Sequence, residues 1–253
     1  MESLDFNGKN VSIWRKPFYR GMSLTIEPNG ELQLKVGQGA RPQRLLNFLA
    51  SKKKWIDKHL AKIEETQKKF PKKSFKEGEL YPFCGNTYAL KFVESQRVFV
   101  VFSGEELLFH CPKDYPMGRA WDRLREAYKE TAAILLGRKT DEFSKIMKLK
   151  HNGVSFRAQK SIWGSCSGEN KISLNWKLIV APSWVIDYVV IHELAHIRFK
   201  DHSSNFWKLV ELYTAKRKEA RIWLRENVYA GDFLTGSSAL WPAERLPEPS
   251  PKS

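Results

Sequence analysis

The segment HELAHIRFKDH, residues 192 to 202, places three of the chain's six histidines within eleven positions. On an α-helix, His192 and His196 are one turn apart, so both imidazoles can face one ion. Glu193 lies beside the first histidine, where its carboxylate can reach a water molecule on that ion. The spacing therefore predicts a catalytic metal site on a helix.

His202 is the candidate for a third ligand. It follows His196 by six residues, which is roughly 240° around a continuous helix, so it can reach the same ion only if the helix stops first. The polar pair Lys200 and Asp201 supplies the expected turn. Phe199 stands where a glycine would allow a sharper turn, which indicates that the helix runs as far as this residue. Three neutral imidazoles suit zinc among the divalent metals.

A purely structural zinc site is the main alternative for these residues. Closed structural sites usually use four protein ligands rich in cysteine. The nearest cysteine, Cys166, lies 26 residues before His192, so the better prediction is a site with an open position for water. We hypothesise that Glu193 removes a proton from a zinc-bound water and that the resulting hydroxide attacks a polarised carbonyl. Glu193 then returns the proton to the leaving amine.

The predicted function is that of a zinc-dependent hydrolase, and the preferred form of it is a metallopeptidase acting on protein or peptide substrates. The candidates for stabilising the oxyanion are Tyr188, Tyr213, Arg157 and Lys160. A first alternative is a zinc-dependent nucleotide hydrolase, in which the same zinc chemistry cleaves a phosphoanhydride bond. A second alternative is a nucleic-acid-associated module whose protease activity is confined to bound proteins.

The charge of the chain keeps both alternatives open. Lys and Arg number 43 against 28 Asp and Glu, which gives a formal net charge of +15. Residues 51–76 alone carry ten lysines against Asp57, Glu64 and Glu65, a local balance of +7. Such a surface attracts nucleotides or nucleic acids through their phosphates. A solvated helix face with few aromatic residues is the plainer interpretation.

The amino-terminal half alternates between strand and helix patterns. Residues 10–36 read as short strands, with a hairpin turn at Asn29 and Gly30. Residues 42–69 have the apolar spacing of a helix. Strand patterns return between residues 80 and 111, and we expect them to extend the first sheet.

The carboxy-terminal half carries the metal helix. A long helix over residues 118–148, either continuous or broken near Gly137, is expected to pack over it, and a β-hairpin with its turn at residues 167–170 precedes it directly. These elements make the fold class α+β. We expect an amino-terminal α+β region over residues 1–117, a metal-binding catalytic region over residues 118–236, and a Pro-rich flexible tail over residues 237–253.

The composition predicts a cytoplasmic enzyme. A hydrophobic content of 42% in 253 residues is enough for a sizeable core. The cysteines are scattered and odd in number, so no disulfide framework is expected. The first residues lack the pattern of an export signal, and no apolar run is long enough to cross a bilayer. We therefore expect no membrane partner.

The chain resembles the YgjP-like family of predicted metallopeptidases, relatives of the SprT-like and WLM proteases within the zincins. In the second half the resemblance rests on KSIWGSCS at 160–167, ISLNWKLIVAPSWVIDYVVIHELAH at 172–196 and DHSSNFW at 201–207. In the first half it rests on LTIEPNGELQLKV, WIDKHL and FKEGELYPFCGNTYAL. One departure is Ile162, where the family usually has a basic residue before the Trp-Gly-Ser-Cys run.

The resemblance covers the chain except for the Pro-rich tail. It implies a small amino-terminal β-sheet with a helix, followed by a zincin-like catalytic region with an HExxH helix. It also implies that His192, His196 and His202 are the metal ligands and that Glu193 is the catalytic base. These are the residues that the spacing selects.

Overall fold

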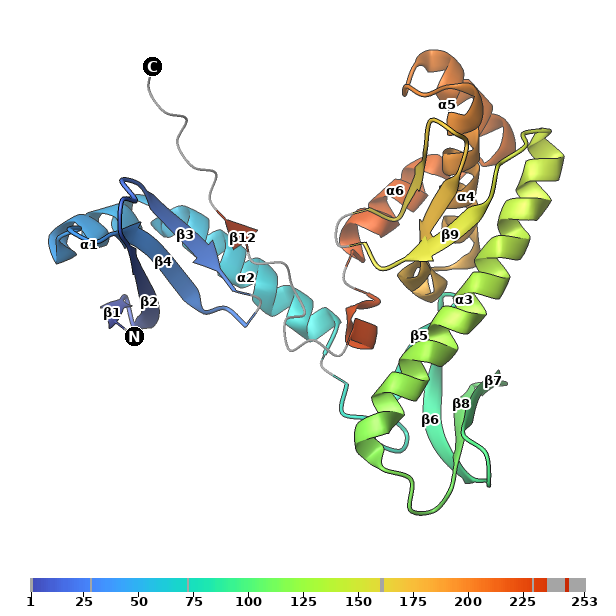
Figure 1. The fold of residues 1–253 in the computed structure, drawn as a ribbon, viewed down its shortest axis with the longest axis horizontal. Helices are drawn as coiled ribbons and strands as arrows, with labels where there is room; N and C mark the ends of the chain where they lie inside the picture. Colours follow the sequence, from blue (N-terminus) through green and yellow to red (C-terminus); the bar gives the residue numbers. More distant parts are fainter. Residues whose placement is uncertain are drawn as a thin grey trace. The chain divides into compact units, whose positions relative to one another are not determined.

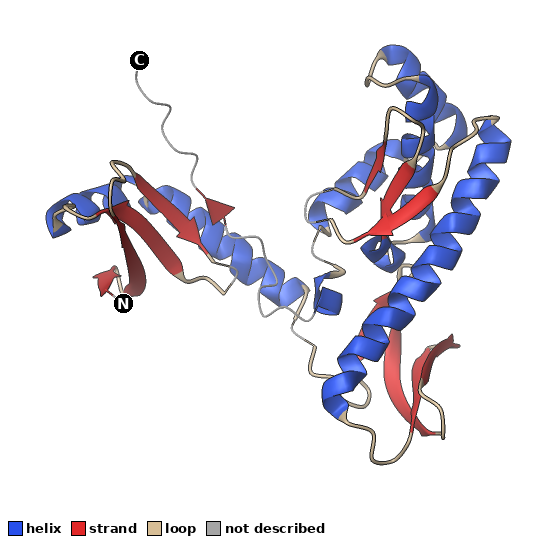
Figure 2. Cartoon of the chain, viewed as in Figure 1, coloured by secondary structure: helices blue, strands red, loops and turns tan. Residues whose placement is uncertain are grey.

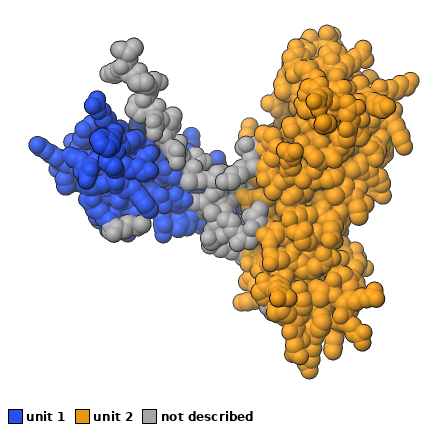
Figure 3. All heavy atoms as spheres, in the orientation of Figure 1, with its two compact units in different colours: residues 1–72, 237–253 blue, residues 73–236 orange. Residues whose placement is uncertain are grey.

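The fold of the chain is drawn in Figure 1 as a computed structural model, which describes residues 2–27, 29–71, 73–159, 162–228, 230–235 and 244–245. Two compact units are distinguished by colour in Figure 3: Met1–Lys72 with Ser237–Ser253, and Lys73–Gly236. Both units combine helices and strands, as Figure 2 shows. The predicted α+β fold class is confirmed.

The first unit is a sheet with two helices. Its strands are β1 (Glu2–Phe6), β2 (Lys9–Lys16), β3 (Met22–Ile26), β4 (Leu32–Gly37) and β12 (Glu244–Arg245), and its helices are α1 (Pro42–Ser51) and α2 (Lys53–Lys69). The strand order is β1-β2-β4-β3-β12. β2 and β4 run parallel, and the other neighbours run antiparallel. The hairpin turn predicted at Asn29 and Gly30 is confirmed, because it joins β3 to β4 and Gly30 has a φ of 87°.

One face of this sheet carries the core of the first unit. Leu45 and Leu49 of α1 and Ile56 and Ile63 of α2 are buried together with alternate side chains of the strands. The strand members of this core are Phe6, Val11, Ile13, Leu24, Ile26, Leu32, Leu34 and Val36. Because successive side chains of a strand point to opposite faces, the residues between them face away from the helices. α1 and α2 therefore cover one face only (Figure 1).

The second unit contains two further sheets and the remaining helices. Its elements are β5 (Leu80–Phe83), β6 (Asn86–Glu94), β7 (Phe99–Ser103), β8 (Glu106–Cys111), α3 (Met117–Met147), β9 (Val154–Arg157), β10 (Gly164–Cys166), β11 (Ile172–Asn175), η1 (Trp176–Val180), α4 (Ser183–Arg198), α5 (Ser204–Tyr213), α6 (Arg217–Glu226) and η2 (Asp232–Thr235). The strand orders are β5-β6-β8-β7 and β10-β11-β9. The predicted hairpin at residues 167–170 is confirmed, since β10 pairs antiparallel with β11.

The strands between residues 80 and 111 do not extend the first sheet, so that expectation is wrong. They form the β5–β8 sheet, which packs on α3 through aromatic side chains. Tyr128 of α3 is fully buried, donates a hydrogen bond to the carbonyl of Pro82 at 2.9 Å, and packs edge-to-face on Phe83 and Phe102. A sheet must bury its apolar face against some element, and here that element is α3.

The compact units divide at Lys72, and the boundary predicted at residue 117 lies inside the second unit. The division into regions 1–117 and 118–236 stays a prediction about how the chain is organised. Most of the predicted flexible tail, residues 237–253, lies outside the described residues. None of the described helices combines the length and the hydropathy needed to cross a membrane.

α3 is a long support for the rest of the second unit. It is continuous over 31 residues and ends where Lys148 adopts a left-handed φ of 54°. It runs past both sheets of this unit (Figure 1) and packs on α4, as predicted. Lys139 of α3 forms an ion pair with Asp187 of α4. This ion pair and the packing hold α4 against α3.

Candidate metal centre

α4 carries the first two histidines of the predicted site. It begins directly after Pro182, a residue whose fixed φ suits a helix start. The helix packs on α3, α5, α6 and β10, so it is enclosed on most sides. Its buried residues are Val185, Ile186, Tyr188, Val189, Val190, Ile191, Glu193, Leu194 and Ala195. An enclosed helix holds His192 and His196 one turn apart with little freedom to move.

The segment after α4 brings the third histidine back toward the first two. α4 ends at Arg198, and Phe199 already has an extended backbone with a φ of −127°. The expectation that the helix includes Phe199 is therefore wrong by one residue. The chain bends at Lys200 and Asp201, where the sequence indicated the turn. His202 follows this bend directly.

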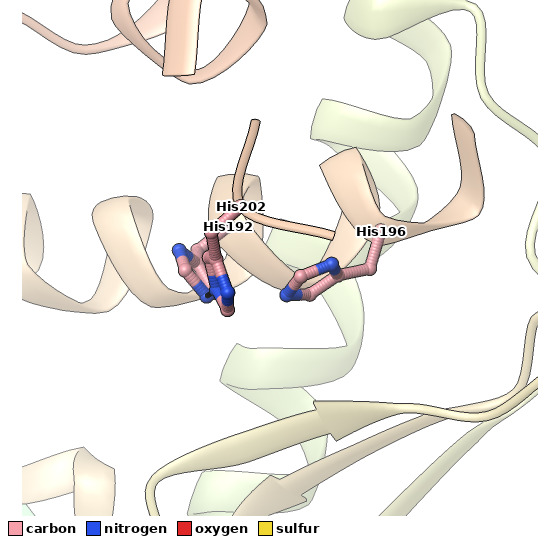
Figure 4. A group of neighbouring side chains, drawn as sticks. All are labelled: His192, His196 and His202. Atoms are coloured by element: carbon pink, nitrogen blue, oxygen red, sulfur yellow. Dashed lines mark hydrogen bonds between the residues drawn. The ribbon is translucent and has the colours of Figure 1, made fainter. Parts of the chain in front are cut away.

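His192, His196 and His202 form what we call the histidine cluster. One ring nitrogen of each residue lies within 4.8 Å of those of the other two, and Figure 4 shows the rings of His192 and His202 close together with that of His196 beside them. Nε2 of His192 and Nε2 of His202 are 3.2 Å apart. Tetrahedral zinc with bonds of about 2.0–2.1 Å would separate two ligand nitrogens by about 3.3–3.4 Å. The three nitrogen donors thus fit a zinc ion in type, and the His192–His202 pair also fits it in spacing.

The protonation of His192 and His196 suits metal binding. Burial lowers the pKa of His192 to about 3, and the charges of His196, His202 and Arg221 add to this effect. Burial also lowers the pKa of His196. Nδ1 of His196 lies 2.9 Å from the carbonyl oxygen of Phe199. A neutral ring that donates from Nδ1 keeps the lone pair on Nε2 for a metal.

Phe206 of α5 forms an apolar floor beneath the histidine cluster. It is fully buried, and its ring centroid lies 5.0 Å from that of His192, 4.5 Å from that of His196 and 4.8 Å from that of His202. Trp207 packs beside it against His192 and His202. An apolar shell of this kind excludes water from one side of the cluster. Spacing along the chain did not indicate this role for either aromatic residue.

Glu193 is buried, with an exposed fraction of 6%, and its side chain lies against β10. A Cβ atom built on Gly164 would lie 2.7 Å from Cγ and 2.8 Å from Oε1 of Glu193. Burial raises the pKa of Glu193 to about 8, because the charged form loses its hydration. A divalent cation at the histidine cluster would lower this pKa again.

The hairpin that carries Gly164 is anchored by Asn175. The side chain of Asn175 is buried, and its Nδ2 donates to the carbonyls of Gln159 at 2.8 Å and Ile162 at 3.2 Å. Its backbone N–H donates to the carbonyl of Trp163 at 2.9 Å. These bonds hold the segment just before Gly164 on β11. The β10 strand is therefore positioned against α4 by a residue that motif spacing does not reveal.

Lys200 links the segment after α4 to the same hairpin. Its Nζ donates to the carbonyl of Ser167 and to Oδ1 of Asn170, each at 3.0 Å. Asn170 has a left-handed φ of 59° within the turn. The turn thus restrains the segment that carries His202, whereas the sequence indicated Lys200 only as part of a polar break.

The oxyanion candidates from the sequence lie in different surroundings. Tyr188 is buried, and its ring centroid is 5.8 Å from that of His192. Arg157 lines a cavity of about 680 Å³ over β9, β10 and β11, and the histidine cluster does not line this cavity. Tyr213 ends α5, and Lys160 lies outside the described residues. Tyr188 is the candidate in direct ring contact with the cluster.

The comparison with protein-family models agrees with a metal-dependent enzyme. The family model of the YgjP-like metallopeptidase domain matches residues 20–227. The metallopeptidase zymogen abylysin of Pyrococcus abyssi is similar at 26% identity and a TM-score of 0.32, over 36% of this chain and 93% of that one. The metallopeptidase zymogen jannalysin of Methanocaldococcus jannaschii is similar at 17% identity and a TM-score of 0.34, over 37% of this chain and 96% of that one. Among curated proteins there is no match.

Proposed function

This chain belongs to the YgjP-like family of metallopeptidase domains, and we propose that it hydrolyses peptide bonds with a zinc ion held by the histidine cluster. As a member of this family it is a metal-dependent hydrolase. We assign protein or peptide chains as its substrates and Glu193 as its general base.

The convergence of the histidine cluster beside a buried carboxylate carries this proposal. Three imidazole nitrogens lie within 4.8 Å of one another, and Glu193 follows His192 directly on the same helix. Three protein ligands leave one position of a tetrahedral ion for substrate or water, which is the arrangement of catalytic rather than structural zinc sites. The absence of cysteine from the cluster agrees with this choice.

A divalent ion in this position supplies Lewis acidity, which polarises the scissile carbonyl and lowers the pKa of water. Glu193 accepts the proton that the attacking water loses and then donates it to the leaving amine. Gly164 leaves the carboxyl group of Glu193 in place, because no side chain competes for that space. The carbonyl of Phe199 orients His196, and Phe206 packs beneath all three imidazoles.

The test compares two substrate classes on the same preparation. Protein purified without a histidine tag is analysed for metal and then incubated with an unfolded polypeptide or with nucleoside triphosphates. Each reaction is repeated with Glu193→Gln, with Glu219→Gln as a matched control on the exposed side of α6, and after chelation with zinc added back. We expect polypeptide cleavage by the wild type and by Glu219→Gln, and its loss in Glu193→Gln and after chelation.

Phosphate release that depends on Glu193, without any polypeptide cleavage, would overturn the peptidase proposal in favour of a phosphoanhydride hydrolase. Cleavage that survives both Glu193→Gln and chelation would show that the activity belongs to another site or to a contaminant. Both results contradict our assignment of the substrate or of the base.

A further inference from the structure

The sheet of the first unit has a second face that none of the described helices covers. Val11 and Ile13 of β2 point to the core. Because successive side chains of a strand point to opposite faces, Ser12 and Trp14 point to the second face. The strand register places Trp14 next to Lys35 of β4. In the same register the polar residues Ser12, Gln33 and Thr25 lie side by side across three strands.

Aromatic and basic side chains lie on this open face and in the connection that follows β2. Trp14 is 46% exposed, and Phe18, in the connection after β2, is fully exposed at 103%. Nζ of Lys35 lies 4.6 Å above the ring centroid of Tyr19. Lys16 continues the face beyond Trp14 by the alternation of the strand. We call Trp14, Lys16, Phe18, Tyr19, Arg20 and Lys35 the aromatic–basic surface.

The connection that carries Phe18 is held in place at an energetic cost. Phe18 has a left-handed φ of 60°, which is unfavourable for a bulky side chain. The backbone of Tyr19 crosses so close to β4 that a Cβ built on Gly37 would lie 2.1 Å from the carbonyl oxygen of Tyr19. The connection is thus fixed, yet it leaves the Phe18 ring in solvent. Packing does not account for that ring, whereas a bound partner would.

The charge of the first unit specifies the kind of partner. Residues 1–72 contain 15 Lys and Arg against 7 Asp and Glu, a net charge of +8. Lys16 and Arg20 are exposed, and within the described residues neither forms an ion pair. Uncompensated cations beside exposed aromatic rings attract a polyanion that also offers flat surfaces for stacking.

We propose that the aromatic–basic surface binds single-stranded nucleic acid. Bases stack on Trp14 and Phe18, and the phosphates lie along Lys16, Arg20 and Lys35. Open sheet faces with exposed aromatic residues bind single strands in this way because every base has a stacking face, and lysine contacts release counterions. A lipid surface fits less well, since Ser12, Gln33 and Thr25 make the rest of the face polar rather than apolar.

This binding is separate from peptide hydrolysis. Residues 1–19, which contain Trp14 and Phe18, lie outside the part of the chain that the family model matches. The surface belongs to the first unit, whereas the histidine cluster belongs to the second. The inference therefore does not depend on the proposed function.

The experiment measures fluorescence anisotropy of labelled oligonucleotides with the full-length protein. The probes are single-stranded DNA and RNA of about 20 nucleotides, long enough for one binding face, and the matching duplex; vesicles of anionic phospholipid are tested by co-sedimentation. We compare Trp14→Ala, Phe18→Ala and the conservative Trp14→Phe. The double variant Lys16→Gln/Lys35→Gln is matched by Lys54→Gln/Lys58→Gln, which removes the same charge from the exposed side of α2. Thermal unfolding verifies that each variant folds.

We expect single strands to bind in a salt-dependent manner, with DNA and RNA differing only in degree. Trp14→Ala and Phe18→Ala each weaken binding by about tenfold or more, and Trp14→Phe retains most of it. Lys16→Gln/Lys35→Gln weakens binding more than Lys54→Gln/Lys58→Gln does. Equal loss in the two lysine variants, duplex binding as tight as single-strand binding, binding to vesicles only, or no binding at all would each overturn the proposal. If Trp14→Ala fails to fold, Phe18→Ala decides, because its ring makes no interior contact to lose.

Discussion

Gly164 of β10 lies directly against the carboxyl group of Glu193 on α4. A Cβ on Gly164 would come within 2.9 Å of Cγ, Cδ and Oε1 of Glu193. Real side chains essentially never approach so closely, so any residue other than glycine must displace the carboxylate. The glycine of the Trp-Gly-Ser-Cys segment therefore makes room for the proposed general base.

Gly164→Ala is expected to reduce hydrolysis by about 100-fold, since misplacing a catalytic group by about 1 Å costs that much. Zinc content should stay near that of the wild type, because Glu193 is not a ligand. The matched control is Gly168→Ala in the turn of the same hairpin, where an added Cβ meets no atom within 4 Å. Steady-state kinetics and metal analysis make the comparison. Wild-type activity in Gly164→Ala would argue against Glu193 as the base.

His202→Ala is expected to weaken zinc binding by more than about 100-fold. Loss of a residue that only hydrogen-bonds to a ligand already weakens metal binding by about 10–100-fold, and His202 is itself a proposed ligand. The variant keeps the two histidines of α4 but lacks Nε2 of His202, which lies 3.2 Å from Nε2 of His192 in the wild type. Zinc affinity is measured by competition with a chelating dye. His59→Ala, which changes a histidine of the other unit, should bind zinc as the wild type does. If both variants bind zinc equally well, His202 is not a ligand.

Glu79 is expected to make the stability of the second unit sensitive to acid. Burial tends to raise the pKa of its carboxyl group, but hydrogen bonds from the N–H groups of Ser74, Phe75 and Lys76 and from the hydroxyl of Tyr81 lower it overall. A lowered folded-state pKa contributes stability above the unfolded pKa of about 4.3, and this contribution is lost as the pH falls through the folded value.

Glu79→Gln should therefore lower the free energy of unfolding by about 1–3 kcal/mol at pH 7, and by less at acid pH. Urea denaturation at neutral and acid pH measures the difference. Glu105→Gln, in the exposed turn before β8, serves as the control and should match the wild type at both pH values. A Glu79→Gln effect that does not shrink in acid would exclude the charged carboxylate as its cause.

The ion pair between Lys177 of η1 and Asp232 of η2 is expected to be costly to break. Its side chains are only 11% and 17% exposed. Asp232→Ala leaves the Lys177 ammonium with less compensation in a mostly buried place, which should lower the free energy of unfolding by about 3–5 kcal/mol. The double variant Lys177→Met/Asp232→Leu should lie much closer to the wild type. A double-mutant cycle of Lys177→Met and Asp232→Leu that shows no coupling energy would contradict this.

Spacing along the chain determined the parts of this protein that depend on local geometry. His192 and His196 face one point because a helix repeats every 3.6 residues, and the break at Lys200 and Asp201 allows His202 to approach the same point. The turn at Asn29 and Gly30 and the α+β class follow in the same way, from the φ preference of glycine and from apolar periodicity. Each of these rests on residues close together in the sequence.

Only the tertiary structure decided which distant segments meet. The pattern of the strands over residues 80–111 is compatible with pairing to the first sheet and with a separate sheet. They form a separate sheet, which packs on α3 and buries Tyr128. The approach of Gly164 to Glu193 and the packing of Phe206 on all three histidines are also contacts between separate elements. Such contacts are selected by the burial of apolar surface over the whole unit, which periodicity within one segment does not encode.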